Sequence, residues 1–554
     1  MNNELDTDVL VIGAGPTGLT AATELTRHGL NALVVDRHGE GVRNSRALTV
    51  HARTLELLRN RGISDELVRS GYPSPGINIS VDTRNPAIVE MFSLDTTYPF
   101  VLIISQAQTE EILEAELMRV GGAVERSTTV VRVDQDSSSV TAYCRDAEGM
   151  ERRIRARYLI DCGGAHGVSV KQLGVPSRGG RFEGVAMLAD VRYEGELTKG
   201  FITNYASDRG VCLILPFKDD YVRVIALGFT KQDASASTPL ELADLQETVD
   251  AIAPIRLHLH DPRWLSHFHA PHRIVDRYRT GRIFLAGDAA HLFIPAGGQG
   301  MNTGIQDALN ISWKLALVIR GAAEASLLDS YHTERHAVAE QTLKASDALF
   351  RIFLSQAQHR LVRSLAPLLL RKLVARSAIR YRAAATLSQI GVHYRNETRS
   401  GRRRGRSGGR RALRPGDRLP DAEIVTTEDP QGHLHDLLAH SGFTVFGYIS
   451  PLQSPASQRS VAARLSSIVD GYAATARAVL VRSEGLADDS DIPVVVDIKR
   501  QVRHRLGMTP GSVLVARPDG YVAFHAHVSG DAAADNATFA SLMDPWSRPT
   551  RRTG

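Results

Sequence analysis

A glycine-rich segment near the amino terminus has the residue types and spacing that bind a dinucleotide. It lies between an apolar run and a helical pattern, and it consists of Gly13, Ala14, Gly15, Pro16, Thr17 and Gly18. In this G-x-G-x-x-G pattern the first glycine permits a tight turn, the second lets the backbone approach a pyrophosphate, and the third lets helix and strand pack closely. Asp36 ends the next apolar run, where its carboxylate can accept hydrogen bonds from ribose hydroxyls. We therefore predict a nucleotide site here rather than a bare turn.

A second glycine-rich segment lies much later in the chain. An apolar run ends at Gly287, which places Asp288 at the carboxyl end of a strand, where ligands bind to parallel sheets. The loop and helix start that follow contain Pro295, Gly298, Gly300, Met301 and Asn302. Backbone N–H groups at such a helix start favour an anionic or carbonyl partner. Because both motifs occur in this order, an ordinary turn before a helix is the weaker interpretation.

The elements that must position these motifs are indicated by apolar periodicity. Residues 5–36 have the pattern strand, glycine turn, helix, strand, with strands at 7–12 and 32–35 and a helix at 19–28. This βαβ unit predicts an α/β fold with a Rossmann-type sheet. Between about residues 76 and 272 alternating segments such as 211–216 and 221–228 predict an inserted mixed β-sheet that supplies a substrate cavity. The last part of the chain alternates strands with a helix, as in a separate small α/β domain.

Composition bounds the class of protein. The 554 residues are 43% hydrophobic and 23% charged, which is typical of soluble multidomain proteins. The net charge of +5 is due largely to an Arg-rich tract at 402–411, which we interpret as a solvated loop rather than a nucleic-acid site. Three cysteines without metal-ligand spacing fit a reducing cytoplasm, and we expect no metal, no secretion signal and no membrane span.

The second motif and its surroundings resemble a known family. The sequence GRIFLAGDAAHLFIPAGGQGMNTGIQDALNISWKLALVIRG is similar to the second FAD motif of single-component flavoprotein aromatic hydroxylases, especially those that act on anthracycline, angucycline and tetracycline skeletons. The segments around Arg46, Gln106 and Asp519 extend the likeness over most of the chain. The resemblance implies that Asp36 binds the adenosine ribose, that Arg46 and Gln106 contact the ribityl and diphosphate region, and that Asp288 holds the ribityl chain. Residues 295–302 would lie against the isoalloxazine ring, and Arg37 and Val130 complete the expected FAD contacts.

The resemblance also implies an activity. Noncovalent FAD, reduced by NADPH or NADH, would react with molecular oxygen, and its C4a-hydroperoxide would hydroxylate a polycyclic aromatic polyketide in antibiotic biosynthesis. This chemistry requires no protein nucleophile. A base that forms the substrate phenolate is not assigned, and Arg46, Arg53 and His291 are the candidates. The substrate pocket is expected between the flavin and the middle sheet, with 211–216 and 221–228 in its wall, in a cytoplasmic monomer or homodimer.

The family organisation maps onto this sequence in seven segments. The FAD-binding domain is expected at 1–75, 104–180 and 273–396, and the substrate domain at 76–103 and 181–272. An Arg/Gly-rich linker at 397–415 leads to a thioredoxin-like domain at 416–543. The place for its redox cysteines, residues 450–455, contains none, so dithiol chemistry is excluded and a scaffolding or oligomer-contact role is expected.

One motif departs from the family. The family has Asp-Gly followed shortly by Arg-Ser between the two FAD motifs, serving the FAD diphosphate and NAD(P)H, whereas Gly163, His166 and Gly167 occupy the Asp, Arg and Ser positions here. Asp161 lies two residues earlier on the same side of its strand and is expected to substitute in part. The departure puts NAD(P)H use in doubt. It leaves open a same-fold flavoenzyme that catalyses Baeyer–Villiger insertion, rearrangement or dehydrogenation, and a non-catalytic protein that binds FAD or a product.

Overall fold

The structure is a computed structural model that describes most of the chain. The described residues are 4–41, 47–80, 87–181, 185–229, 239–268, 271–294, 297–358, 376–395, 413–438, 442–472, 475–485, 492–527, 532–544 and 546. Arg46, Pro295 and most of the expected linker lie outside them.

A mainly parallel sheet of order β19-β20-β11-β1-β2-β8 organises the amino-terminal domain. β1 (Thr7–Ile12) is almost wholly buried, as expected of a strand covered on both faces. α1 (Pro16–Arg27) begins after Gly15 with proline in its first turn and returns the chain to β2 (Ala32–Val35). The other strands are β8 (Val124–Glu125), β9 (Thr129–Gln135), β10 (Val140–Arg145), β11 (Glu151–Asp161), β19 (Arg279–Thr280) and β20 (Ile283–Leu285). Because β2 and β11 flank β1 on opposite sides, the carboxyl end of β1 is a topological switch point.

A seven-stranded mixed sheet forms the second unit, in the order β17-β13-β16-β15-β14-β5-β6. Only β14 and β5 pair in parallel; the other neighbours are antiparallel. The strands are β5 (Gly76–Ser80), β6 (Ala87–Glu90), β13 (Ala186–Gly195), β14 (Ile202–Ser207), β15 (Gly210–Pro216), β16 (Tyr221–Gly228) and β17 (Leu257–Phe268). α6 (Leu242–Ile252) covers one face through an apolar core of its own. The expected inserted mixed sheet is therefore confirmed.

Short elements join these two sheets. β7 (Val101–Ile103), which the sequence placed in the substrate segment, pairs with β3 (Thr49–Val50) and β4 (Tyr72–Ser74) instead. The first substrate segment thus ends before β7. The remaining short elements are β12 (Ser177–Arg181), β18 (Pro271–Val275), β21 (His291–Leu292), α2 (Ala52–Arg59), α3 (Ser64–Ser70), α4 (Gln106–Arg119), α5 (Val168–Gln172), η1 (Gly164–His166), η2 (Gly287–Ala289) and η3 (Ala325–Leu328).

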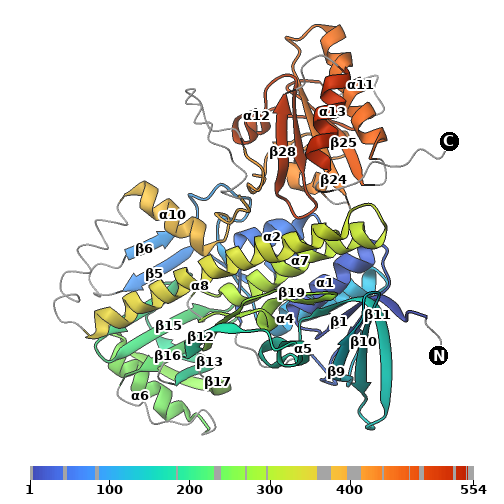
Figure 1. The fold of residues 1–554 in the computed structure, drawn as a ribbon. Helices are drawn as coiled ribbons and strands as arrows, with labels where there is room; N and C mark the ends of the chain where they lie inside the picture. The colour runs from blue at the N-terminus through green and yellow to red at the C-terminus, as the bar shows by residue number, and fades with distance from the viewer. Residues whose placement is uncertain are drawn as a thin grey trace.

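Two long helices cross the molecule side by side (Figure 1). α7 (Gln299–Ile319) is buried along nearly its whole length, and α8 (Asp329–Gln358) packs against it. α10 (Ser377–Leu387) follows. Among the described residues no helix is long and apolar enough to cross a membrane, and no group of three or more His, Cys, Asp or Glu residues could hold a metal ion.

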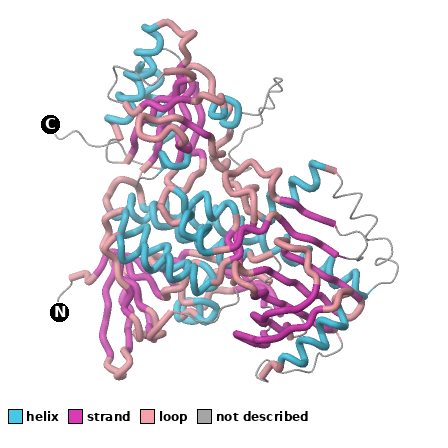
Figure 2. The backbone as a smooth tube through the Cα atoms, turned by 180° about the vertical axis from the view of Figure 1, so that it is seen from behind, coloured by secondary structure: helices cyan, strands magenta, loops and turns pink. Residues whose placement is uncertain are grey.

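The carboxyl-terminal unit is a five-stranded sheet of order β26-β25-β24-β27-β28. It stands at one end of the molecule beyond α7 (Figures 1 and 2). β24 pairs in parallel with β25 and antiparallel with β27, which fits the expected thioredoxin-like fold. Its elements are β22 (Glu423–Ile424), β23 (Gly432–His433), η4 (Leu434–Leu438), β24 (Phe443–Ile449), α11 (Pro455–Asp470), β25 (Ala476–Arg482), β26 (Val494–Val496), α12 (Gln501–Leu506), β27 (Ser512–Ala516), β28 (Val522–His527) and α13 (Ala532–Met543).

This unit has a sheet and an apolar core of its own, and it shares a second hydrophobic cluster with α7. Trp313 and Leu317 of α7 are buried in one cluster with Phe443 and Val445 of β24. The rings of Trp313 and Phe443 meet edge to face, with centroids 5.8 Å apart. Removing the carboxyl-terminal unit would therefore expose part of the helix that carries the second motif.

Buried charges reinforce the same interface. Arg517 donates to both carboxylate oxygens of Glu334 at 2.6 and 2.9 Å, and Lys314 donates to Glu334 at 2.7 Å. Asp519 accepts from Arg517 at 2.6 Å and from Asn310 at 3.0 Å. Burial lowers the pKa of Lys314 to about 8. Burial opposes ionisation of Glu334, but Arg517 and Lys314 hold its pKa well below the usual value.

Replacing Arg517 should therefore destabilise the folded protein strongly. Arg517→Met leaves two buried carboxylates without their main cation, so we expect a loss of about 3 kcal/mol. Arg132→Met is the matched control, because Arg132 pairs with Asp134 at 3.0 Å while both side chains are half exposed; its loss should be below about 1 kcal/mol. Thermal and urea unfolding of both variants measure the difference, and equal losses would contradict the assignment.

Candidate nucleotide site

The first glycine motif has the local geometry that its sequence predicts. Gly13 has φ +94°, and a Cβ there would lie 2.6 Å from the carbonyl oxygen of Cys162. A Cβ on Gly18 would lie 1.8 Å from the carbonyl oxygen of Gly13, so helix and strand touch at this point. Beside Gly15 there is open space, since the nearest atom to a Cβ is Oε1 of Glu110 at 3.9 Å. The middle glycine therefore faces room for a pyrophosphate at the N-terminus of α1.

Asp36 lies at the carboxyl end of β2, next to this turn. Its Oδ2 accepts from the backbone N–H of Ala14 at 2.6 Å, and its Oδ1 accepts from that of His38 at 2.8 Å. Arg37 is directed toward His38, with 3.3 Å between Nε and the imidazole Nε2. Val130 packs beneath, in the apolar cluster that contains Val35. Asp36, expected at the ribose, and Arg37 and Val130, expected among the other FAD contacts, thus lie together at one end of the turn.

The second motif meets the first at the side chain of Thr17. A Cβ on Gly287 would lie 2.6 Å, and one on Gly304 2.3 Å, from Oγ1 of Thr17. Asp288, in the turn after β20, is exposed, and its Oδ1 would lie 4.0 Å from a Cβ on Gly300. Its carboxylate is therefore close to the N-terminus of α7.

The loop before α7 has a conformation that requires glycine. Gly297 and Gly298 have φ +93° and +63°, and a Cβ on Gly298 would lie 1.8 Å from Oγ1 of Thr49. The side chain of Asn302 donates to the carbonyl oxygen of Gly298 at 2.9 Å, while Met301 packs against the main core. The open flank of Gly15, the carboxylates at both ends and two helix N-termini together fit a dinucleotide such as FAD.

Gln106 and Glu110 form a pair on α4 that faces the first motif. Nε2 of Gln106 donates to Oε1 of Glu110 at 2.7 Å, and this oxygen is the atom nearest to the open flank of Gly15. Ser105 caps the helix by accepting from the N–H of Gln108. The sequence singled out Gln106; the structure adds Glu110 to the lining of the same space.

Two of the candidate bases lie in structural positions. His291 is fully buried and its Nε2 lies 2.6 Å from Oδ2 of Asp307. Arg53 is also fully buried and donates to the carbonyl oxygens of Asp519 and Gly520 at 3.2 and 3.1 Å. Arg53 therefore contacts the carboxyl-terminal domain, and burial leaves neither side chain exposed to a substrate.

Asp161 explains the departure between the two motifs. Its fully buried carboxylate accepts from the N–H groups of Gly163 at 2.8 Å and Ser169 at 3.0 Å. A Cβ on Gly163 or on Gly167 would lie 2.9 Å from this carboxylate. Burial raises the pKa of Asp161. Relative to the family motif, the acidic side chain, that of Asp161, thus lies below the loop, and Gly163 and Gly167 leave space for it. His166 is exposed.

The middle sheet turns one face toward the nucleotide-binding domain. On β15, Cys212 and Ile214 pack against α6, whereas Leu215 and its neighbour Leu213 belong to the main core. Asn204 of β14 pairs with Leu213 across the strands and therefore lies on the same face, and Leu213 pairs in turn with Ile225 of β16. Asn204 is 4% exposed, and its Oδ1 has no hydrogen-bond partner. The same face carries the buried ion pair of Arg223 with Asp190, at 2.7 Å. This mainly apolar face, with its buried carboxamide and ion pair, is a candidate substrate wall.

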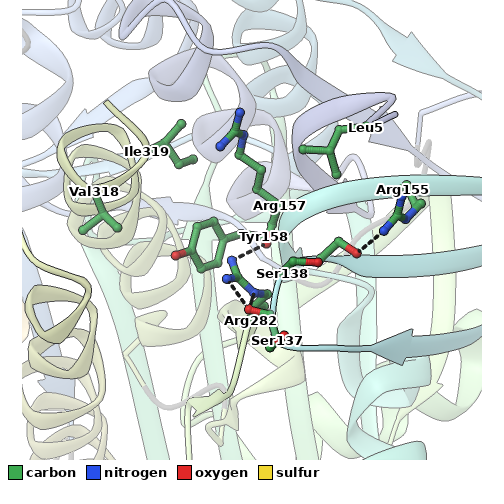
Figure 3. A pocket seen from close by; sticks show the side chains of 10 residues that line it. Leu5, Ser137, Ser138, Arg155, Arg157, Tyr158, Arg282, Val318 and Ile319 are labelled. Atoms are coloured by element: carbon green, nitrogen blue, oxygen red, sulfur yellow. Dashed lines mark hydrogen bonds between the residues drawn. The ribbon is translucent and has the colours of Figure 1, made fainter. Parts of the chain in front are cut away.

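A separate hollow of about 480 Å³ opens at the opposite edge of the central sheet (Figure 3). It is lined by the middle of β11 and by Arg282 just before β20, whereas the glycine motifs lie at the carboxyl ends of the sheet strands. Arg282 there donates to the carbonyl oxygens of Ser137 and Arg157 and lies over the Tyr158 ring. These contacts hold the turn between β9 and β10 against the central sheet. The hollow is not the nucleotide site.

Comparisons with known proteins agree with this geometry. Residues 6–346 match the family model described as "FAD binding domain". The chain is 31% identical over 552 residues to the 12-dehydrotetracycline 5-monooxygenase/anhydrotetracycline 6-monooxygenase of Streptomyces rimosus subsp. rimosus, which covers 98% of this chain and 99% of that protein. The solved anhydrotetracycline hydroxylase from Streptomyces rimosus is 28% identical with a TM-score of 0.76, covering 98% and 100% of the two chains. A Diels-Alderase of pyrroindomycin biosynthesis is 26% identical with a TM-score of 0.72, covering 98% and 100%.

Substitutions at two glycines should separate cofactor binding from folding. Gly15→Val fills open space beside the first motif, so the apoprotein should keep its unfolding temperature while the FAD dissociation constant rises at least about tenfold, or 1.4 kcal/mol. Gly18→Ala places a methyl group 1.8 Å from a backbone oxygen and should prevent stable folding. Flavin titration and thermal unfolding test both. Normal FAD affinity in Gly15→Val would place the pyrophosphate elsewhere.

Proposed function

The chain belongs to the family of FAD-binding flavoprotein monooxygenases, and we propose that it hydroxylates a polycyclic aromatic, polyketide-type substrate. The observation that carries the proposal is the juxtaposition of the two glycine motifs at Thr17, opposite an apolar sheet face. The relative from Streptomyces rimosus subsp. rimosus is named as a monooxygenase of tetracycline compounds and matches this chain over nearly its whole length. It supports this substrate class. We propose that the enzyme acts in the cytoplasm as a monomer or homodimer.

Each end of the site has a role in holding FAD. Asp36 would accept the adenosine ribose hydroxyls, Gly15 would admit the pyrophosphate, and Asp288 would hold the ribityl chain. When bound, FAD would accept electrons from a nicotinamide nucleotide and would activate oxygen for transfer to the aromatic substrate. The sheet face around Leu213 and Leu215 would exclude water and hold the aromatic ring of the substrate in place. Arg46 lies outside the described residues, and we propose for it a contact with the ribityl and diphosphate region of FAD.

The experiment measures oxygen transfer directly. Purified protein is incubated with NADPH, labelled oxygen and a hydroxylated anthraquinone or naphthacene, and the products are analysed by mass spectrometry. One labelled oxygen atom per product, with NADPH consumption that depends on the substrate, would support the proposal. Conversion of substrate without NADPH consumption would favour the second candidate, a same-fold enzyme without net hydroxylation. That candidate is favoured by the changed loop at Gly163 and His166 and by the Diels-Alderase relative.

The changed loop should limit flavin reduction. Because His166 stands where the family has an arginine, the loop lacks a permanent cation for the nicotinamide nucleotide. We expect slow reduction by NADPH in the absence of substrate and faster reduction in His166→Arg, whose exposed side chain requires no repacking. Gly163→Asp is unsuitable because its Cβ would meet Asp161. Anaerobic stopped-flow reduction tests this, and fast reduction of the wild type would contradict it.

Asn204 should contribute to substrate binding rather than to stability. Its buried Oδ1 lacks a partner, so Asn204→Leu should leave the unfolding temperature unchanged or raise it. The same variant should raise KM for a hydroxylated substrate about tenfold, because one hydrogen bond is lost. Asn78→Leu is the matched control, since Asn78 pairs with Thr203, whose cross-strand partner Ile214 lies on the α6 face. An unchanged KM in Asn204→Leu would exclude this contact.

A further inference from the structure

Gln389 has an unusual backbone conformation close to the loop before α7. Its φ is +60°, although it is not glycine, and its side chain is 3% exposed. A left-handed φ is unfavourable for such a residue and persists only where the surroundings over-determine it. Gln389 follows α10, and the adjacent Leu387 accepts at its carbonyl from Nε2 of Gln299 at 3.2 Å. The strain is thus located beside the second glycine motif.

The side chain of Gln389 is fully engaged in a buried network. Its Nε2 donates to Oε1 of Gln299 at 2.6 Å and lies 3.2 Å from Oγ1 of Thr303. Its Oε1 accepts from Nε2 of Gln306 at 2.5 Å. All these partners lie on the first two turns of α7. The network therefore compensates the backbone strain and fixes the rotamer of Gln299.

Gln299 and His51 together hold one carbonyl oxygen. Nε2 of Gln299 donates to the carbonyl oxygen of Gly297 at 3.1 Å, and Nε2 of His51 lies 2.8 Å from the same oxygen. Burial lowers the pKa of His51 to about 4, so the neutral imidazole must carry its proton on Nε2 to donate here. The next carbonyl, of Gly298, accepts from Nδ2 of Asn302 at 2.9 Å.

These contacts orient two consecutive peptide planes. In a trans peptide the C=O and N–H groups point in opposite directions. Because the carbonyl oxygens of Gly297 and Gly298 are both held by side chains, the N–H groups of Gly298 and Gln299 point away from the network. Both N–H groups lie at the N-terminus of α7, where such donors have no partner within the helix.

We propose that Gln389, Gln299 and His51 are positioning residues that fix the Gly297–Gly298 peptide, and with it the adjoining Gly298–Gln299 peptide. The N–H groups of Gly298 and Gln299 would then contact the isoalloxazine ring. The inference rests on the proposed function, because it requires FAD at this site. N–H dipoles held toward the ring favour negative charge on it and so raise its reduction potential. The network thus sets both the affinity for FAD and its potential without contacting the ring through any side chain.

The test uses the full-length holoprotein and its apoprotein with added FAD. Gln389→Gly relieves the backbone strain but leaves the buried carboxamides of Gln299 and Gln306 each without one partner, so the two effects oppose each other and we expect only a small change in the unfolding temperature of the apoprotein. The FAD dissociation constant should rise at least about tenfold, the midpoint potential should become more negative, and the flavin absorption bands should shift. Arg500→Gly is the matched control: it relieves a comparable φ of +55° at an exposed position in the carboxyl-terminal domain and should leave the flavin unchanged.

A second variant keeps the test decisive if Gln389→Gly does not fold. Gln389→Glu preserves the shape of the side chain but replaces its donor by a carboxylate, so the flavin measurements should change in the same direction at pH 8. Wild-type affinity, potential and absorption in whichever variant folds would overturn the proposal. A wild-type protein that binds no FAD would instead contradict the proposed function, so the two failures are distinguishable.

Discussion

The buried carboxylate of Asp307 is the interaction on which the candidate site depends most. It accepts from Arg335 at 2.7 Å and from the backbone N–H of Gly287 at 3.2 Å, and its Oδ2 lies 2.6 Å from Nε2 of His291. Burial would raise the pKa of Asp307, but Arg335 and His291 hold it below its usual value. One ionised group therefore joins α7, α8 and the turn that carries Asp288. The exposed carboxylate of Asp288 has a fixed position because the buried carboxylate of Asp307 behind it is fully paired.

Local constraints made part of the site predictable from sequence. The glycine motifs and Asp36 are predictable because a positive φ, a close helix–strand contact or a strand end admits few residue types. His291 was assigned a possible catalytic role because the sequence does not show that Asp307, one helix away, is its partner. Gln389 carries no motif, and its importance arises from contacts with residues more than 80 positions earlier. Long-range pairing of ordinary residue types is the part that a single sequence leaves open.

The displaced acid at Asp161 shows how one substitution changes its neighbours. The carboxylate at the end of β11 accepts from the loop amides and is fully buried. Its oxygens then occupy the volume that side chains at positions 163 and 167 would use, so glycine is required at both. In this chain the buried acid and the two glycines therefore fit one another, and the loop amides of Gly163 and Ser169 have an acceptor.

The carboxyl-terminal domain has lost the cysteines of a redox domain, yet its contacts explain why it is retained. The backbone N–H of Arg53 donates to the carbonyl oxygen of Ser388, next to Gln389, while the guanidinium of Arg53 donates to carbonyl oxygens at Asp519 and Gly520. The ring of Tyr521 stacks on that of Tyr394 at 4.0 Å, and the hydroxyl of Tyr394 accepts from Arg335 at 3.1 Å. One set of contacts leads to the residue before Gln389, and the other leads through Arg335 and Asp307 to the turn at Gly287. The domain therefore packs against the residues that hold these turns in place.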